Sequence, residues 1–121
     1  MAYIDNLYKQ GFEALSLGLP ERAIPLFEKV LAIDAKNPDA MVGRARALTL
    51  QGQCQKALMD FERALKINEQ HLDAIAYRAR VHLMMDQTSA AQSDIDTALS
   101  MDPGHPGALA TRAQMQTDFQ L

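Results

Sequence analysis

The sequence repeats itself every 34 residues, and this period constrains the fold more than any other feature. The segments ERAIPLFEKVLAID, QKALMDFERALKIN and SAAQSDIDTALSMD align without gaps. Their shared columns are Ala23, Ala57 and Ala91; Phe27, Phe61 and Ile95; and Leu31, Leu65 and Leu99. Within each segment these positions recur at intervals of three and four, which is the period of a helix with one buried face. A fixed period of about 20 to 50 residues indicates a solenoid of stacked units.

The segments between these also repeat, which predicts a second helix in every unit. Their matching positions are Leu7, Met41, Ile75 and Leu109, and then Gly11, Ala45, Ala79 and Ala113. The fourth of these segments, which contains Leu109 and Ala113, is not followed by a second segment. The chain therefore contains three and a half units. We expect an all-α fold of seven helices, at about residues 3–17, 20–33, 38–51, 54–67, 72–85, 88–101 and 106–119.

Local signals place the turns within each unit. Gly18 and Gly52 fall between the two helices of their units, where the backbone can use a positive φ angle. Asp86 occupies the same position in the third unit. Thr88 is a candidate N-cap for the helix that follows.

These features together resemble the tetratricopeptide repeat family. The resemblance rests on the period, on the small residues Gly11, Ala45 and Ala79, on Ala-x-x-x-Phe at Ala23/Phe27 and Ala57/Phe61, and on Pro103, which closes a repeat. It implies a right-handed α-α superhelix that forms a single domain over residues 1–121. The expected parts are repeat 1 at 4–37, repeat 2 at 38–71, repeat 3 at 72–105 and a capping helix at 106–121.

The sequence departs from the family at several positions. The large aromatic residue of the family's first helix is replaced by Leu7, Met41 and Ile75, and the closing proline is absent at Ala35 and Glu69. These changes alter the packing in detail and leave the period intact.

Arginines interrupt the apolar first helices of the second and third repeats. Arg44 and Arg46 are two residues apart, a rotation of about 200°, so they face different ways. Arg44 lies on the face toward the second helix of its repeat. Arginine and aspartate occur together at these positions in repeats 2 and 3 and are both absent from repeat 1: Arg44 with Asp60, Arg78 with Asp94, and Gln10 with Leu26. We therefore predict that each pair joins the two helices of its repeat.

The other arginines, Arg46 and Arg80, point to the opposite side of the first helices. The resemblance implies that this side lines a concave groove, which receives an extended peptide or a helix of a partner protein. The candidate groove residues are Tyr8, Phe12, Asp39, Arg46, Asp73, Tyr77, Arg80 and Met84. The two guanidiniums could hold a carboxylate and a second acceptor, and Tyr8 with Phe12 could form an apolar pocket. The alternative is that both arginines are solvated or paired with nearby aspartates.

One ligand of the family can be tested against the sequence. Some relatives hold the C-terminal carboxylate of heat-shock chaperones with lysines, asparagines and an arginine on the first helices. The corresponding positions carry Tyr8, Phe12, Gly43, Asp73 and Tyr77. None of these matches, so we do not expect a chaperone tail as the ligand.

Composition narrows the remaining classes of function. The net charge is −3, and aspartates stand near the starts of the first helices, so nucleic acid is not an expected partner. No apolar run approaches the roughly 20 residues that cross a bilayer, no secretory signal opens the chain, and Cys54 is the single cysteine. We expect a cytoplasmic protein without a membrane partner.

Catalytic and metal-binding patterns are hardly present. His71 and His105 occupy equivalent loops, but no carboxylate or cysteine completes the spacing of a metal site. Serines and threonines show no arrangement for nucleophilic catalysis. We expect no enzyme activity and no cofactor.

A second function stays open, in which the chain is a scaffold that associates with itself. Tyr3 and Ile4 at the start, with Phe119 and Leu121 at the end, could join copies end to end or as a dimer. The convex face is another candidate surface for such contacts.

Overall fold

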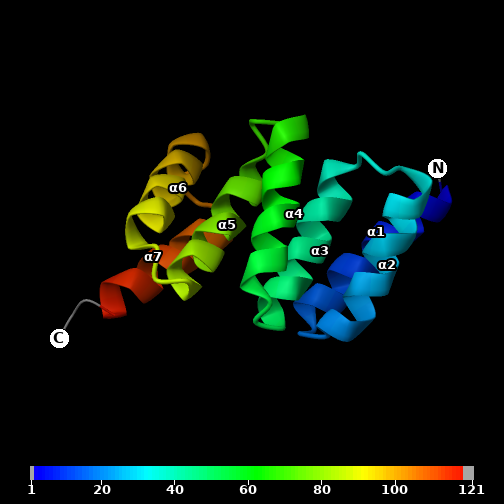
Figure 1. Cartoon of the computed structure of the whole chain (residues 1–121), viewed down its shortest axis with the longest axis horizontal. Coiled ribbons are helices and arrows are strands. Elements are labelled where there is room, and N and C mark those ends of the chain that lie inside the picture. The colour runs from blue at the N-terminus through cyan, green and yellow to red at the C-terminus, as the bar shows by residue number, and fades with distance from the viewer. Residues whose placement is uncertain (1, 119–121) are drawn as a thin grey trace. The chain divides into compact units, whose positions relative to one another are not determined.

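The computed structural model describes residues 2–118, and within them it contains seven α-helices and no strand (Figure 1). The helices are α1 (Ala2–Ser16), α2 (Pro20–Ile33), α3 (Pro38–Leu50), α4 (Cys54–Ile67), α5 (Leu72–Met84), α6 (Thr88–Met101) and α7 (Pro106–Asp118). The helices predicted from the 34-residue period are confirmed to within one residue at each described end.

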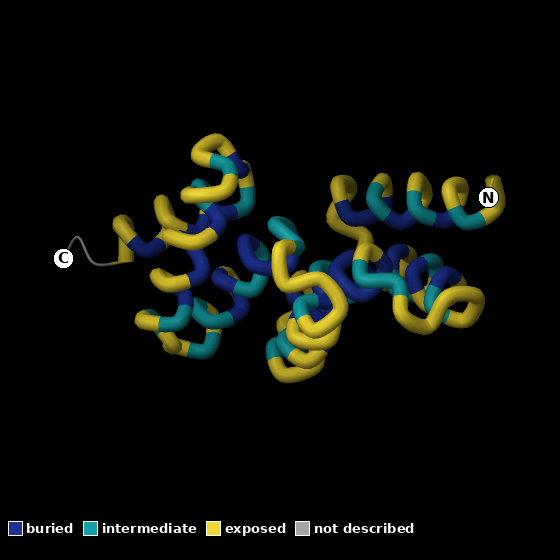
Figure 2. The backbone as a smooth tube through the Cα atoms, turned by 90° about the horizontal axis from the view of Figure 1, so that it is seen from above, coloured by how far each residue is buried: buried dark blue, intermediate teal, exposed yellow. Residues whose placement is uncertain are grey.

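The contacts between helices group into two compact units, Met1–Glu69 and Gln70–Leu121. In the first unit α2 packs between α1 and α3, and α3 packs on α4. In the second unit α5, α6 and α7 all contact one another. Within each unit the buried residues lie on the faces that the helices turn toward each other (Figure 2). The single domain over 1–121 stays a prediction.

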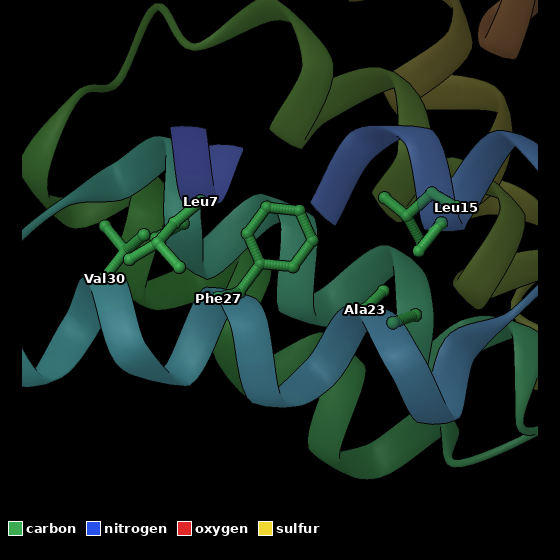
Figure 3. Close-up of a cluster of buried hydrophobic side chains, with 8 residues drawn as sticks. Leu7, Leu15, Ala23, Phe27 and Val30 are labelled. Carbon is green, nitrogen blue, oxygen red and sulfur yellow. The ribbon is translucent and has the colours of Figure 1, made fainter. Parts of the chain in front are cut away.

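The core of the first unit is built around Phe27, whose side chain is fully buried. Its ring points from α2 toward α1, between Leu7 and Leu15 (Figure 3). A Cβ atom added at Gly11 would lie 2.7 Å from Phe27 Cζ, and one added at Gly43 would lie 2.4 Å from Phe27 Cε1. The ring therefore occupies the space that side chains at these two glycines would need.

The core of the second unit joins α7 to the preceding helices. Met115 of α7 is buried in one cluster with Ala79, Ala91 and Ile95. This contact confirms that the last helix packs back onto the third repeat. The spacing of four residues between Met115 and Phe119 predicts that Phe119 packs on the same side of the helix, but Phe119 lies outside the described residues.

The turns inside the repeats have the conformation that the sequence predicts. Gly18 and Gly52 have φ angles of 70° and 75°, and Asp86 has a φ angle of 59°. After each of them, the next backbone N–H donates to the carbonyl five positions back, at 2.8 to 2.9 Å. This bond closes the helix end in the pattern that favours a left-handed residue, usually glycine.

Two N-caps of first helices, those of α3 and α5, were not predicted from the sequence. Asn37 accepts a hydrogen bond from the Ala40 N–H at 3.1 Å, and the Nδ1 atom of His71 accepts one from Ala74 at 3.2 Å. The prediction of Thr88 as an N-cap is wrong, because it is the first residue of α6. The residue before it, Gln87, makes no capping bond with its side chain.

Candidate functional site

The predicted pair between Arg44 and Asp60 is confirmed. Arg44 donates from Nε and Nη2 to the two carboxylate oxygens of Asp60, at 2.8 and 2.9 Å. The Asp60 side chain is only 3% exposed. Its hydrogen bonds raise the pKa of the Arg44 guanidinium above the ordinary value. The pair therefore joins α3 to α4 as a structural contact.

Arg78 and Asp94 make the same contact in the second unit, with both hydrogen bonds at 2.8 Å. His82 adds a group that the sequence did not predict. Its Nε2 atom lies 3.7 Å from Asp94 Oδ2, and its Nδ1 atom lies 2.7 Å from the side-chain oxygen of Gln87. Arg78 and His82 thus both face the carboxylate of Asp94. Arg44 and Arg78 therefore have a structural role, because each joins the two helices of its repeat.

The candidate groove residues in the first unit are half-buried or engaged within the chain. The Tyr8 and Phe12 rings stack at 6.2 Å, and Phe12 meets Phe27 edge-on at 5.0 Å. Burial, followed by the nearby Asp39 carboxylate, raises the pKa of Tyr8. Asp39 and Arg46 each have an interaction within the chain. Phe12 therefore contributes to the core, and the pocket of Tyr8 and Phe12 stays a prediction.

Two candidate groove residues in the second unit contact His105. Its Nε2 atom lies 2.7 Å from Asp73 Oδ1, and its ring meets Tyr77 edge-on at 5.5 Å. Its Nδ1 atom accepts hydrogen bonds from the Gly107 and Ala108 N–H groups, so we assign the ring hydrogen to Nε2. The buried imidazole connects α5 to the start of α7. The only sequence signal for this connection was the presence of histidine at the matching positions 71 and 105.

Arg80 is placed differently from the arginine two residues before it. It is exposed, and no ion pair or hydrogen bond within residues 2–118 holds its guanidinium. It lines a hollow of about 270 Å³ between α5 and α7, together with Leu83, Met84, Gln114 and Asp118. Met84 is 44% exposed. Arg80 and Met84 are thus the two candidate groove residues of this unit that line the same hollow, where both could contact one ligand.

The described part of the chain offers few other kinds of site. No helix in it is long and apolar enough to cross a membrane. Nor does it bring together three histidine, cysteine or acidic side chains that could hold a metal ion. The lining of the hollow beside Arg80 combines a cation, an anion, an amide and apolar carbon.

Comparisons with known proteins agree with this architecture. The tetratricopeptide repeat family model matches residues 14–58. No curated protein matches the sequence significantly. With its three helix pairs and its last helix packed on the third pair, the chain has the fold of tetratricopeptide repeat domains.

Solved structures with the same fold cover nearly the whole chain. The Arabidopsis OM64 TPR domain has a TM-score of 0.82 at 18% identity, and the match covers 98% of both chains. The first TPR of Spaghetti (RPAP3), bound to the HSP90 peptide SRMEEVD, has a TM-score of 0.83 at 19% identity over 99% of this chain and 98% of that one. The second TPR domain of human RPAP3, in complex with the HSP70 peptide SGPTIEEVD, has a TM-score of 0.77 at 22% identity over 95% and 96%. At these identities the likeness establishes the fold.

Proposed function

We propose that the chain is a protein-interaction module that binds a peptide or a helix of a partner protein on the surface of its first helices. The observation that carries this proposal is Arg80, an exposed guanidinium without a partner in the described chain, beside a hollow with an exposed methionine. Domains of similar fold bind peptides, as the RPAP3 domains in complex with HSP70 and HSP90 peptides do. We further propose that the protein acts in the cytoplasm, without a cofactor and without enzyme activity.

The groups in the hollow define the ligand chemistry that we propose. Arg80 can donate two parallel hydrogen bonds to a carboxylate, which is the strongest geometry for such a pair. Leu83 and Met84 offer apolar contact for a neighbouring side chain. Gln114 and Asp118 can bond to the peptide backbone. The ligand would therefore have an acidic group beside an apolar side chain.

A chaperone tail is not the ligand that we propose, although two of the similar domains bind such peptides. Three positions that would have to hold the tail have other roles within the chain. Gly43 has no room for a side chain beside Phe27, while Asp73 and Tyr77 contact His105. A negative Asp73 would also repel an acidic tail. We expect the peptide SRMEEVD to bind no better than its scrambled form.

Selection from a display library of random peptides, followed by anisotropy measurements on labelled winners, tests the proposal. Arg80→Ala should weaken binding by about fivefold or more, since arginine anchors in such contacts contribute about 1 kcal/mol or more. Its unfolding free energy should change by less than about 0.5 kcal/mol. Arg112→Ala is the matched control, because Arg112 is an exposed arginine outside this hollow. If no peptide is selected, or if both variants bind alike, the proposal is wrong.

Self-association is the competing function. Tyr3 is 61% exposed, whereas Ile4 packs partly on the first core, and Phe119 and Leu121 lie outside the described residues. Sedimentation velocity over a range of protein concentrations separates the two. If the protein keeps the mass of a monomer at all concentrations and binds the peptide in that state, the result supports the interaction module.

A further inference from the structure

A second hollow, of about 400 Å³, lies on the first unit between α2, α3 and α4. Its volume is within the range of about 300 to 1,000 Å³ that is usual for ligand sites. Apolar carbon is supplied by Ile24, Leu48 and Met59, and Met59 is 51% exposed. The hollow contains no residue of the predicted groove, so it is a separate surface.

The charged side chains around this hollow leave an excess of cations. Asp60 is neutralised by Arg44, and Arg63 also contacts it, with Nη1 at 3.3 Å from Oδ1. Glu28 is the other carboxylate and lies 3.9 Å from Arg44. The Lys56 ammonium has no partner among residues 2–118. Arg63 is 53% exposed, so its guanidinium can contact a ligand beside its bond to Asp60, and Lys56 is the cation that has no partner in the described residues.

The first repeat provides an internal comparison. It has a hollow of about 470 Å³ between α1 and α2, in the same register. Gln10 and Leu26 occupy the positions of the arginine and the aspartate there, and the rim has one residue of each charge, Glu13 and Arg22. The excess of cations is therefore a property of the hollow in repeat 2 and does not follow from the repeat architecture.

We propose that the hollow between α2, α3 and α4 is a second docking surface, which takes an acidic segment of a partner protein. A carboxylate of the segment lies between Lys56 and Arg63, and an aliphatic side chain next to it packs on Met59 and Leu48. Charge complementarity selects this occupant, since a basic or neutral segment would leave Lys56 without a partner and the excess of cations around the hollow unbalanced.

Two matched peptides test the charge requirement, acetyl-Leu-Glu-Glu-Leu-amide and acetyl-Leu-Gln-Gln-Leu-amide. In a titration of the ¹⁵N-labelled full chain, the glutamate peptide should shift the backbone amides of residues 56–63. The glutamine peptide should bind about fivefold more weakly, as expected for the loss of one or two exposed ion pairs. Equal shifts with both peptides, or no shifts, would overturn the proposal.

Variants of α4 locate the binding surface. Lys56→Glu should abolish the shifts at residues 56–63, whereas Lys66→Glu, on the same helix but outside the hollow, should keep them. Arg80→Ala should also keep them, which separates this surface from the proposed groove. Equal losses in the two lysine variants, or shifts on α5 and α7 instead, would contradict the assignment. Concentration-dependent broadening without peptide that Lys56→Glu removes would mean that a second copy of the chain is the occupant, and would also overturn it.

Discussion

Exchanging Arg44 and Asp60 for glutamine and leucine, the residues of the first repeat, tests what the ion pair contributes. The aspartate side chain is 3% exposed and the arginine 24%, so the single variants strand different charges. Arg44→Gln leaves a buried carboxylate with only Arg63 beside it, and we expect a loss of about 3 kcal/mol, the low end for breaking a buried pair. Asp60→Leu leaves a guanidinium that reaches solvent and Glu28, and we expect a loss of about 1.5 kcal/mol.

The double variant removes both charges together and should lose only about 1 to 2 kcal/mol, so the coupling energy is about 3 kcal/mol. Urea denaturation followed by circular dichroism measures the free energy of unfolding for all four proteins. Arg63→Gln is the control, because an exposed member of a pair contributes less than about 1 kcal/mol. Additive losses in the cycle, or an Arg44→Gln loss no larger than that of Arg63→Gln, would refute the reasoning.

Three further predictions, each tested by thermal unfolding, concern the packing and the helix ends. Gly43→Ala should lose about 1 to 2 kcal/mol, because overpacking against Phe27 exceeds the gain of about 1 kcal/mol in helix propensity, whereas Gly104→Ala, whose nearest contact is 3.7 Å, should be almost neutral. Asp86→Gly should gain roughly 0.5 kcal/mol by relieving the positive φ angle, and a loss would contradict the assigned turn. His105→Ala should lose about 1 to 2 kcal/mol, and asparagine at this position should restore part of it, because asparagine caps α3 at the matching position; equal losses would argue against the cap.

The fold could be predicted from the sequence because one 34-residue period determines several features of the structure at once. The 34-residue columns give the number of helices, their limits and the buried faces together, and the pairing of Arg44 with Asp60 followed from their joint presence and absence. Asp86 could be placed in the left-handed conformation by its register with Gly18 and Gly52.

The site could be predicted only in part, since it depends on side chains that meet across helices. Arg46 and Arg80 have the same register, yet Arg46 is engaged within the chain and Arg80 has no partner among the described residues. The bonds of His105 to Asp73 and to two backbone N–H groups need ring positions that spacing does not supply. Phe12 fitted a groove pattern but also contacts the Phe27 ring.

The most direct test of the proposed function is the footprint of a selected peptide on the backbone amides of the ¹⁵N-labelled chain. If the peptide binds beside Arg80, the amides of α5 residues 77–84 and α7 residues 110–118 should shift, and the shifts should decrease as salt screens the charge contact. Arg80→Ala should remove them while Arg112→Ala keeps them. Shifts confined to other surfaces, or the same footprint in the Arg80→Ala variant, would contradict binding on the first helices.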